Sequence, residues 1–366
     1  MAKQLMKGNE AIAEAAIRAG LQFYAGYPIT PQNEIPEYLS RELPKAGGVF
    51  VPCETETAGV CMVYGASSTG ARCMISSSGP GIALMQECIS YLNVSRLPAV
   101  IVDVMRTGPG GGNLAGSQDD FNMMVRGGGN GQYRMITLAP CSGQEAVELM
   151  RPAFELADLY RNPVMFMCDG VIGQAMESVD FDLMPPPRTD LPPKESWSLH
   201  GRGYTGDNVK LPDGQLREKR AVLSDEPGMD IYQTCTYREE VLYPEMIKNE
   251  VRYEAIGLED AEIVLCAYGT TSRMAKDAIK ILEGKGVKAG IIRPITLWPF
   301  CNEVFEKLGD KCKAVVVAEM NAGGQMLEVV KLAVNGARPV HFVGNRNTMI
   351  NANSIAAKVM EVKEAL

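Results

Sequence analysis

The sequence predicts an α/β protein with two parallel-sheet domains, and three observations support this fold class. Apolar segments rich in β-branched residues alternate with helix-like segments in the first half and again near the end of the 366-residue chain, which is the pattern of parallel sheets covered on both faces. The length favours two or three domains. Eight of the 22 prolines fall between the two regions, where the alternation stops. We therefore expect a first domain over 1–175, a proline-rich linker or arm with a helix over 176–255, and a second, smaller domain over 256–366.

The first domain is expected to open with a helix in MAKQLMKGNEAIAEAAIRAG. Strands are predicted in LQFYAGYP, FVPC, ARCMISSS, LPAVIVDVM, YRMITLAP and PVMFMCD, and helices in TETAGVCMVYGASS, GIALMQECISYLNV and EAVELMRPAFELADLY. Ser142 and Glu145 have the spacing of a capping box before the last of these helices.

The alternation of predicted strands and helices returns in the last part of the chain, after one irregular stretch. In the middle, QTCTYREEVLYPEMIKNEVRYEAIG is expected to be helical with a break near Pro244. In the second domain, strands are predicted in AEIVLCAYG, KAGIIRP, KAVVVAEM and PVHFVGN, and helices in SRMAKDAIKILEGKG, NEVFEKLG, GGQMLEVVKLAVNG and SIAAKVMEVKEAL.

Composition excludes several classes of protein. The net charge of −8 argues against a nucleic-acid or anionic-membrane surface. No apolar run is long enough for a transmembrane helix, and the first residues lack the apolar core of a signal peptide, so we expect a cytoplasmic protein. No two of the ten cysteines are closer than eight residues. Because zinc and iron–sulfur sites usually draw on closer pairs, we expect no metal site here and mostly buried, unreactive thiols.

The residues that follow the strands are informative, because ligands of open parallel sheets bind at the carboxyl ends of the strands. In the first domain these residues are 28–31 (PITP), 76–81 (SSSGPG), 106–110 (RTGPG) and Asp169-Gly170. They offer hydroxyls, glycine backbone and one fixed cation, which suits a small anion. Ser, Gly and Pro also build ordinary turns, and each loop alone admits that simpler interpretation. Three such loops at one sheet edge favour a site.

Two other glycine patterns need weighing. Residues 110–115 (GGGNLA) fit G-x-G-x-x-A after a strand, but GSQDDFNMMVRGGGNGQ is an untypical continuation of a nucleotide-binding turn. The triple glycines at 110–112 and 127–129 instead predict a mobile lid over 107–131. Asp169-Gly170 is similar to the start of a thiamine-diphosphate metal motif, but Cys168 replaces its first glycine and no Asn pair follows at the expected distance. A strand-end turn is the better interpretation.

Four segments carry a resemblance: GYPITPQNEIPEYLS, CETETAGVCMVYGASSTGARCMISSSGPGIALMQECISYL, VDVMRTGPG and IIRPITLWPF. With them the chain resembles the alpha subunit of the 2-oxoacid:ferredoxin oxidoreductases over nearly its whole length, most closely the 2-oxoisovalerate (branched-chain) type and next the 2-oxoglutarate type. The resemblance implies a thiamine-diphosphate pyrimidine-binding domain followed by a transketolase C-terminal-like domain. It also implies a partner beta subunit that binds the diphosphate and Mg²⁺, together with an iron–sulfur (ferredoxin-like) subunit and a gamma subunit. Iron–sulfur clusters then lie on partner subunits.

The resemblance also assigns roles to residues. Activation of this cofactor requires a carboxyl that shares a proton with pyrimidine N1′ in a dry setting, and the family pattern E-x-A-A/G places that carboxyl at Glu56 rather than Glu54. Thr30 and Arg106 are implied to hold the substrate carboxylate, with Pro28 and Pro31 stiffening the hook around Thr30. The implied cofactor-binding residues are Tyr27, Pro28, Ile29, Glu56, Ser78 and Gly79, and no metal ligand is expected on this chain.

Simpler roles stay open for these residues at this point. Both glutamates suit a helix N-terminus, where the helix dipole favours acids. Thr30 suits the cap of a helix entered at Pro31. Arg106 suits a surface ion pair with Asp119 or Asp120.

The predicted function is the oxidative decarboxylation of a 2-oxoacid to acyl-CoA and CO₂, with CoA and ferredoxin as co-substrates, by a subunit active only with its partners. A nicotinamide-dependent dehydrogenase that uses the glycine-rich loop and a non-catalytic assembly subunit are the alternatives. The substrate stays open: 2-oxoglutarate needs a second cation, for which Arg126 and Arg134 are candidates, whereas a branched-chain acid needs an apolar lining.

Overall fold

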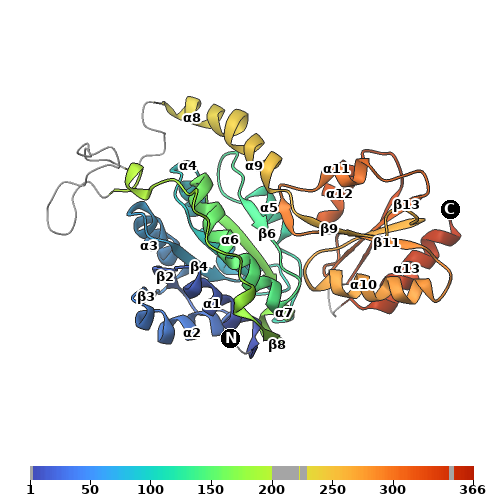
Figure 1. Ribbon diagram of the computed structural model, residues 1–366, viewed down its shortest axis with the longest axis horizontal. Coiled ribbons are helices and arrows are strands. Elements are labelled where there is room, and N and C mark those ends of the chain that lie inside the picture. The colour runs from blue at the N-terminus through green and yellow to red at the C-terminus, as the bar shows by residue number, and fades with distance from the viewer. Residues whose placement is uncertain (1–2, 200–221, 223–228, 346–349) are drawn as a thin grey trace.

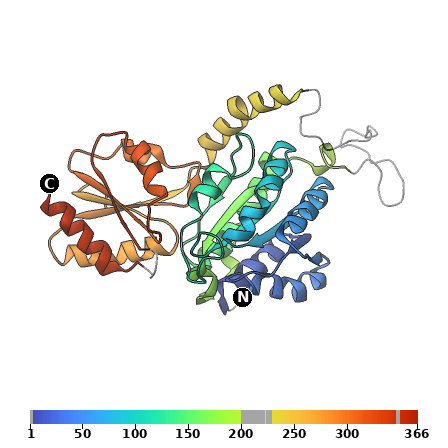
Figure 2. The ribbon, with the colours of Figure 1, turned by 180° about the vertical axis from the view of Figure 1, so that it is seen from behind.

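The computed structural model describes residues 3–199, 222, 229–345 and 350–366. They form two α/β units that lie side by side, and a helical arm runs along the top of the first unit in Figure 1. Figure 2 shows the same arrangement from behind. In the part of the chain that the structure describes, no helix is both long enough and apolar enough to cross a membrane.

The first unit is built on a seven-stranded sheet in the order β12-β6-β7-β5-β4-β2-β3. Its strands are β2 (Phe23–Gly26), β3 (Val49–Pro52), β4 (Cys73–Ser77), β5 (Val100–Met105), β6 (Ile136–Leu138), β7 (Val164–Asp169) and β12 (Thr296–Trp298). All neighbouring strands are parallel except β12, which runs antiparallel to β6.

Helices cover both faces of this sheet, which explains why its central strands β4, β5 and β7 are buried along their whole length. The helices are α1 (Gly8–Arg18), α2 (Glu34–Glu42), α3 (Glu56–Ser68), α4 (Gly79–Val94), α5 (Phe121–Arg126), α6 (Gly143–Tyr160) and α7 (Gly170–Gln174), with a 3₁₀ turn at Pro44–Ala46. Successive strand residues enter opposite cores: Ile75 of β4 packs in the cluster with α3 and α4, whereas Met74 packs in the cluster with α1 and α6.

The N-terminal segment differs from its prediction. Residues 4–7 form strand β1 (Gln4–Lys7), not the first turn of a helix, and pair antiparallel with β8 (Met176–Val179). Within β1 only Met6 is buried, so the segment lacks the apolar stripe of a helix. Its partner lies about 170 residues away, and local sequence carries no sign of the pairing.

The second unit has a five-stranded sheet in the order β14-β13-β10-β11-β9, in which only the edge strand β9 is antiparallel. Its strands are β9 (Tyr253–Ile256), β10 (Ile263–Cys266), β11 (Ala289–Pro294), β13 (Ala314–Glu319) and β14 (Val340–Gly344), and its helices are α10 (Gly269–Glu283), α11 (Asn302–Glu306), α12 (Met326–Val334) and α13 (Ala352–Glu364). Each strand and helix expected in this region is present.

The two units share elements across the expected boundaries. The motif IIRPITLWPF leaves the second sheet after β11 and adds β12 to the edge of the first sheet. Arg293, at the end of β11, is 5% exposed and bonds Glu145 of α6 through both terminal nitrogens at 2.8 Å. Ser142 caps α6 as expected, but Glu145 turns to Arg293 and to the Cys141 amide, so only half of the predicted capping box forms. This motif therefore packs the two units against each other.

The middle of the chain contributes a continuous helical arm. Helix α8 (Ile231–Tyr237), a π-helical turn (Arg238–Leu242) and α9 (Tyr243–Glu250) follow one another without the break expected at Pro244. Proline has no amide hydrogen, and the wider π turn just before it accommodates that loss. The last part of the predicted helix is strand β9 instead, because it pairs with β11. Two 3₁₀ turns, Phe181–Leu183 and Lys194–Ser196, precede the arm, while 200–221 and 223–228, including His200, lie outside the described residues.

Candidate active site

The carboxyl ends of four neighbouring strands bring the predicted site residues to one edge of the first sheet. These strands are β5, β4, β2 and β3, in this spatial order. The residues that follow them are, respectively, Arg106, Ser78, 27–33 and Glu56. Residues from four separate parts of the sequence therefore line one sheet edge, where open parallel sheets bind ligands.

Glu56 is the first residue of α3 and is almost completely buried, with 5% of its surface exposed. Thr55 caps this helix by accepting a hydrogen bond from the Ala58 amide at 3.1 Å, so the carboxyl of Glu56 is not needed as the cap. Ser77 Oγ donates to Glu56 Oε1 at 3.4 Å, a long bond that leaves acceptor capacity on the carboxyl. Glu54 is exposed. Of the two candidate glutamates, only Glu56 is in a dry setting.

Helix α4 begins so close to Glu56 that only glycine fits at its third residue. A Cβ atom on Gly81 would lie 2.4 Å from Glu56 Oε1 and 2.1 Å from Ser77 Oγ. Ser78 precedes this helix and is fully buried, yet its Oγ has no hydrogen-bond partner among the described residues. Because an unpaired buried hydroxyl is costly, Ser78 is suited to contact a bound molecule.

The hook at 27–33 is held from the side of the sheet. Gln32 is fully buried, donates to Tyr27 O at 3.2 Å and accepts from Ser76 Oγ at 2.6 Å. Two side-chain amides, from Asn9 and Gln174, donate to the Pro31 carbonyl at 2.7 and 2.6 Å. These bonds fix the backbone of the hook, while the side chains of its first residues stay at the edge of the site. These first residues are exposed or half-buried, and they are Tyr27, Pro28, Ile29 and Thr30.

Thr30 does not cap a helix, because α2 starts later than predicted. The chain makes a turn in which the Gln32 amide donates to Ile29 O at 3.0 Å, and α2 begins only at Glu34. Asn33 occupies the cap position, and its Nδ2 donates to Thr30 Oγ1 at 3.4 Å. The simpler role considered for Thr30 is therefore wrong, and its hydroxyl hydrogen stays available to a ligand.

Arg106 lies beside Thr30, as the predicted carboxylate site requires. Its Nη1 donates to Thr30 O at 2.9 Å and its Nη2 to Gly111 O at 3.1 Å, while its buried Nε has no partner among the described residues. Among the described residues, Arg106 forms no ion pair with Asp119 or Asp120. Asp119 instead accepts from the Gly108 amide at 3.0 Å. The structure thus joins Arg106 to the Thr30 hook and not to the surface network considered as the alternative.

A pair of buried carboxyls lies behind these residues, and sequence reasoning missed it. Asp103, in the middle of β5, is fully buried, and its carboxyl lies near that of the half-buried Asp120. No described group donates a hydrogen bond to either oxygen of Asp103, and two neighbouring carboxyls away from water favour a state in which they share one proton. Burial, together with Asp120, raises the pKa of Asp103 well above its usual range. Burial and then the charge of Asp119 raise the pKa of Asp120 to about 7, against the opposing effect of Arg106.

The glycine-rich segment is a closed loop and not a nucleotide-binding turn. Thr107 anchors it, with its amide donating to Ala115 O at 3.0 Å and its carbonyl accepting from the Asn113 amide at 2.9 Å. Gly112 has a φ of +59°, and a Cβ there would lie 1.8 Å from Thr107 O. The next helix begins only at Phe121. A phosphate-binding turn needs a helix directly after its glycines, so this geometry disfavours the dehydrogenase alternative.

Two further buried acids have structural roles, Asp169 between the two units and Glu319 within the second unit. Asp169, at the end of β7, accepts from Thr270 Oγ1 at 2.7 Å and from the Thr270 amide at 2.9 Å, although burial still raises its pKa. Glu319, at the end of β13, accepts from the amides of Met326 and Leu327 at the start of α12 at 2.9 and 3.0 Å. Their oxygens are occupied by protein donors, so both acids serve the structure.

Comparison with known proteins identifies the family. Residues 14–190 match the family model described as pyruvate flavodoxin/ferredoxin oxidoreductase, thiamine diphosphate-binding, and residues 261–352 match the pyruvate:ferredoxin oxidoreductase core domain II. Over 363 residues the chain is 43% identical to the ketoisovalerate oxidoreductase subunit VorB of Methanothermobacter marburgensis, covering 99% of this chain and 98% of the relative. The chain belongs to the 2-oxoacid:ferredoxin oxidoreductase family. The resemblance stated from its motifs is thereby confirmed.

Other relatives of this oxidoreductase subunit agree. It is 36% identical to the 2-oxoglutarate synthase subunit KorA of Methanocaldococcus jannaschii, over 91% of this chain and 92% of the relative. Its fold superposes on 2-oxoglutarate:ferredoxin oxidoreductase from Magnetococcus marinus with a TM-score of 0.82 at 24% identity, covering 98% of this chain and 65% of the longer one. A split-gene transketolase gives a TM-score of 0.61 at 16% identity, covering 97% of both chains. The predicted pair of thiamine-enzyme domains is confirmed.

The residues present fit one half of the thiamine diphosphate that the family binds. The buried Glu56 carboxyl and the unpartnered Ser78 hydroxyl lie at the starts of neighbouring helices, with glycine at the point of closest approach. They suit the polar edge of an aminopyrimidine. The described residues contain no cluster of three or more acidic, histidine or cysteine side chains that could hold a metal ion.

Proposed function

We propose that this chain is the subunit of a 2-oxoacid:ferredoxin oxidoreductase that binds the pyrimidine half of thiamine diphosphate and holds the substrate carboxylate. The enzyme oxidatively decarboxylates a 2-oxoacid to acyl-CoA and CO₂ and passes the electrons to ferredoxin. The observation that carries the proposal is the meeting of a buried Glu56 with the Thr30–Arg106 pair at one sheet edge. All ten cysteines are free thiols, which suits the reducing cytoplasm where we place the enzyme.

The mechanism assigns Glu56 to the cofactor. Thiamine diphosphate, when bound, supplies a carbon nucleophile for the 2-oxo group. Glu56 holds a proton at pyrimidine N1′, and its dry setting strengthens that bond. Ser78 directs its unpartnered hydroxyl to the same ligand. Gly79 and Gly81 lack a Cβ and so let the start of α4 lie close to Asp120 and Glu56, respectively.

Thr30 and Arg106 bind the substrate carboxylate in this mechanism. A carboxylate taken out of water needs charge-assisted hydrogen bonds. The Thr30 hydroxyl and the free Nε of Arg106 are unused donors beside each other. Because the hook backbone is already fixed by Gln32 and Ser76, little further ordering is needed when the substrate binds.

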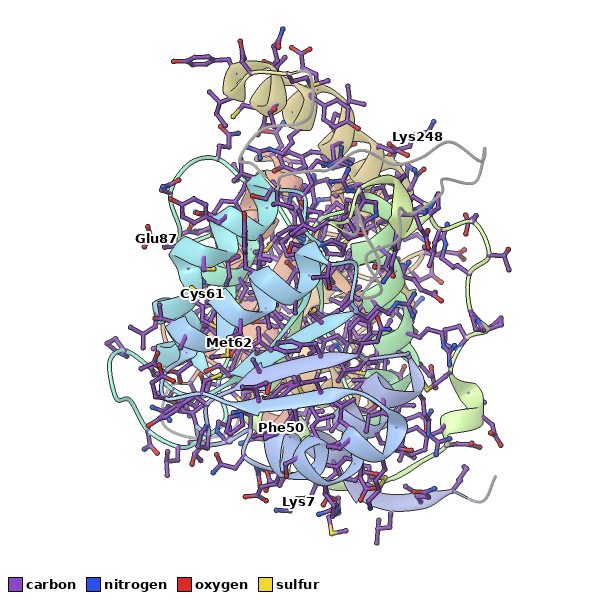
Figure 3. All side chains as sticks on the ribbon, turned by 90° about the vertical axis from the view of Figure 1, so that its left-hand side faces the viewer. Lys7, Phe50, Cys61, Met62, Glu87 and Lys248 are labelled. Carbon is purple, nitrogen blue, oxygen red and sulfur yellow. The ribbon has the colours of Figure 1, made fainter. Side chains whose placement is uncertain are left out.

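The partner beta subunit is proposed to bring the diphosphate and Mg²⁺ site over α3 and α4. These two helices begin at Glu56 and Gly79 and face the viewer in Figure 3, where Cys61, Met62 and Glu87 are labelled. Their outer surface contains no lysine or arginine and exposes apolar side chains, namely Met62 (38%), Leu84 (60%) and Tyr91 (44%). An apolar face beside an incomplete site suits a stable subunit contact. The iron–sulfur and gamma subunits and CoA complete the proposed complex.

A branched-chain 2-oxoacid is the proposed substrate. The two cations considered for the second carboxylate of 2-oxoglutarate are engaged elsewhere: Arg126 pairs with Glu328 at 2.7 Å, and Arg134 Nη1 donates to Arg126 O at 3.2 Å. The higher identity to VorB than to KorA points the same way.

Reconstitution tests the proposal. The chain assembled with its partner subunits should reduce a viologen dye only with thiamine diphosphate, CoA and a 2-oxoacid, fastest with 2-oxoisovalerate. Calorimetry on the chain alone should show weak cofactor binding that does not depend on Mg²⁺. Tight, Mg²⁺-dependent binding by the isolated chain would contradict the division of the site between subunits. Reduction of NAD by the complex would support the alternative of a nicotinamide-dependent dehydrogenase.

A further inference from the structure

A single buried glutamine links the active-site loop of the first unit to the second unit. Gln118 is fully buried and follows the glycine-rich loop, which is pinned to Arg106 by a backbone bridge at Gly116. Its side chain accepts from Thr271 Oγ1 and from the Met320 amide, both at 2.8 Å, and donates to Tyr268 O at 2.9 Å.

The backbone of Gln118 is bound just as fully. Its amide donates to Met320 O at 2.9 Å, and its carbonyl accepts from Asn321 Nδ2 at 3.0 Å. All these partners belong to the second unit, at the start of α10 and in the loop after β13. Each hydrogen-bonding group of the residue is therefore satisfied across the boundary between the units, which is the condition under which a buried amide specifies one position.

The platform that holds Gln118 is itself rigid. Glu319 ties the loop after β13 to the start of α12 and also accepts from Asn321 Nδ2 at 2.9 Å. Next to it, Gln325 donates to Asp119 O and accepts from the Asn122 amide at 2.7 Å. The segment around Gln118 thus rests on a buried hydrogen-bonded network and not on flexible surface contacts.

On the other side, the same segment shapes the proposed carboxylate site. Two residues after Gln118, the Asp120 carboxyl contacts Gly79 so closely that a Cβ there would lie 2.7 Å from its Oδ2. The Asp120 carboxyl also interacts with the buried Asp103, three residues before Arg106. Residues 107–115, of which 109–115 are exposed, leave Arg106 and return to Gly116. A shift of Gln118 would displace both Asp120 and this loop.

We propose that Gln118 is a positioning residue through which the second unit fixes the substrate-carboxylate side of the active site. This inference rests on the proposed role of Arg106. It gives the second unit a part in substrate binding beyond assembly. It also limits any lid to 107–115, because 116–122 is held in place. If Gln118 loosens, the fraction of molecules with the loop in its binding position falls, and the apparent affinity for the 2-oxoacid falls in proportion.

Three variants and a control separate this role from general stability. Gln118→Met keeps the length of the side chain but removes its three hydrogen bonds. Thr271→Val removes one donor at nearly constant shape in the second unit, and Thr271→Ser restores it. Glu328→Gln breaks the exposed pair with Arg126, which also joins the two units, and serves as the control.

The assembled complex is then assayed for the KM and kcat of the 2-oxoacid and for backbone hydrogen exchange over 107–117. We expect the KM to rise about tenfold for Gln118→Met and less for Thr271→Val, with kcat and thiamine diphosphate affinity within about twofold. Thr271→Ser and Glu328→Gln should leave both readouts at wild-type values. Exchange over 107–117 should accelerate in the first two variants only.

The outcomes are distinguishable. Faster exchange with a raised KM supports the inference, and rescue by Thr271→Ser ties it to the hydroxyl. Unchanged exchange in both Gln118→Met and Thr271→Val overturns it, whatever the KM. Faster exchange with an unchanged KM shows that the loop is held as inferred but does not bind substrate, which overturns the role of Arg106 in the proposed function.

Discussion

Replacement of Asp120 by asparagine should stabilise the protein at high pH and have little effect at low pH. Burial raises the pKa of Asp120 from an ordinary 3.8 to about 7. Because the folded state binds this proton more tightly than the unfolded state, the protein is most stable below pH 4 with respect to this group and loses stability as the pH rises through 7. At about 1.4 kcal/mol per pKa unit, the free-energy cost to the folded state is about 2 kcal/mol at pH 5 and about 4 kcal/mol at pH 8.

Asparagine cannot ionise and can donate its amide hydrogen to Asp103. The free energy of unfolding of Asp120→Asn, relative to wild type, should therefore increase by about 2–3 kcal/mol between pH 5 and pH 8. Urea titrations followed by tryptophan fluorescence suit this measurement, since Trp197 and Trp298 both pack against the core of the first unit. Glu328→Gln, which removes a carboxylate that is 56% exposed, should change stability by less than about 0.5 kcal/mol at both pH values. An equal effect of Asp120→Asn at pH 5 and pH 8 would refute the shared proton.

Two other changes test the contacts between the units and at the hook. Arg293→Met leaves the Glu145 carboxylate, only 17% exposed, without its cation and should cost about 3–5 kcal/mol of unfolding free energy. Lys280→Met, which breaks an exposed pair, should cost under about 1 kcal/mol, and similar losses in both variants would contradict the link between the units. Thr30→Val should raise the KM for the 2-oxoacid by about 5- to 30-fold, and Arg106→Gln by more, less than additively in combination, without a change in cofactor affinity. A lower melting temperature with an unchanged KM would make Thr30 structural.

The strands and the main site residues could be predicted because their signals are local. Apolar β-branched runs such as VIVDVM mark buried strands, and the residues after parallel strands must meet at one edge. That geometry places Thr30 and Arg106 at the same sheet edge, and the family resemblance assigned them a shared role. The choice of Glu56 over Glu54 came from the family pattern, and the burial of Glu56 agrees with it.

The remaining features depend on contacts that local patterns do not encode. Strand β1 forms only because β8 is available, and β12 leaves its own unit to extend the first sheet. Gln118 looks like an ordinary polar loop residue until the second unit surrounds it. Asp103 did leave a signal: an acid in the middle of an apolar strand must be neutralised or paired. Its partner, Asp120, is brought to it by the loop that Gln118 anchors.

The most direct test of the account is the exchange of the C2 hydrogen of thiamine diphosphate in the assembled complex, followed by NMR after quenching in deuterated buffer. Glu56→Gln keeps the size of the side chain and an acceptor for Ser77, so the fold and complex assembly should persist. The account predicts that exchange slows at least about 100-fold in Glu56→Gln, because the group that holds the proton at N1′ is lost. In Glu54→Gln, exchange should stay within about twofold of wild type. Exchange at the wild-type rate in Glu56→Gln, or a comparable loss in Glu54→Gln, would contradict the assignment of Glu56 as the activating carboxyl.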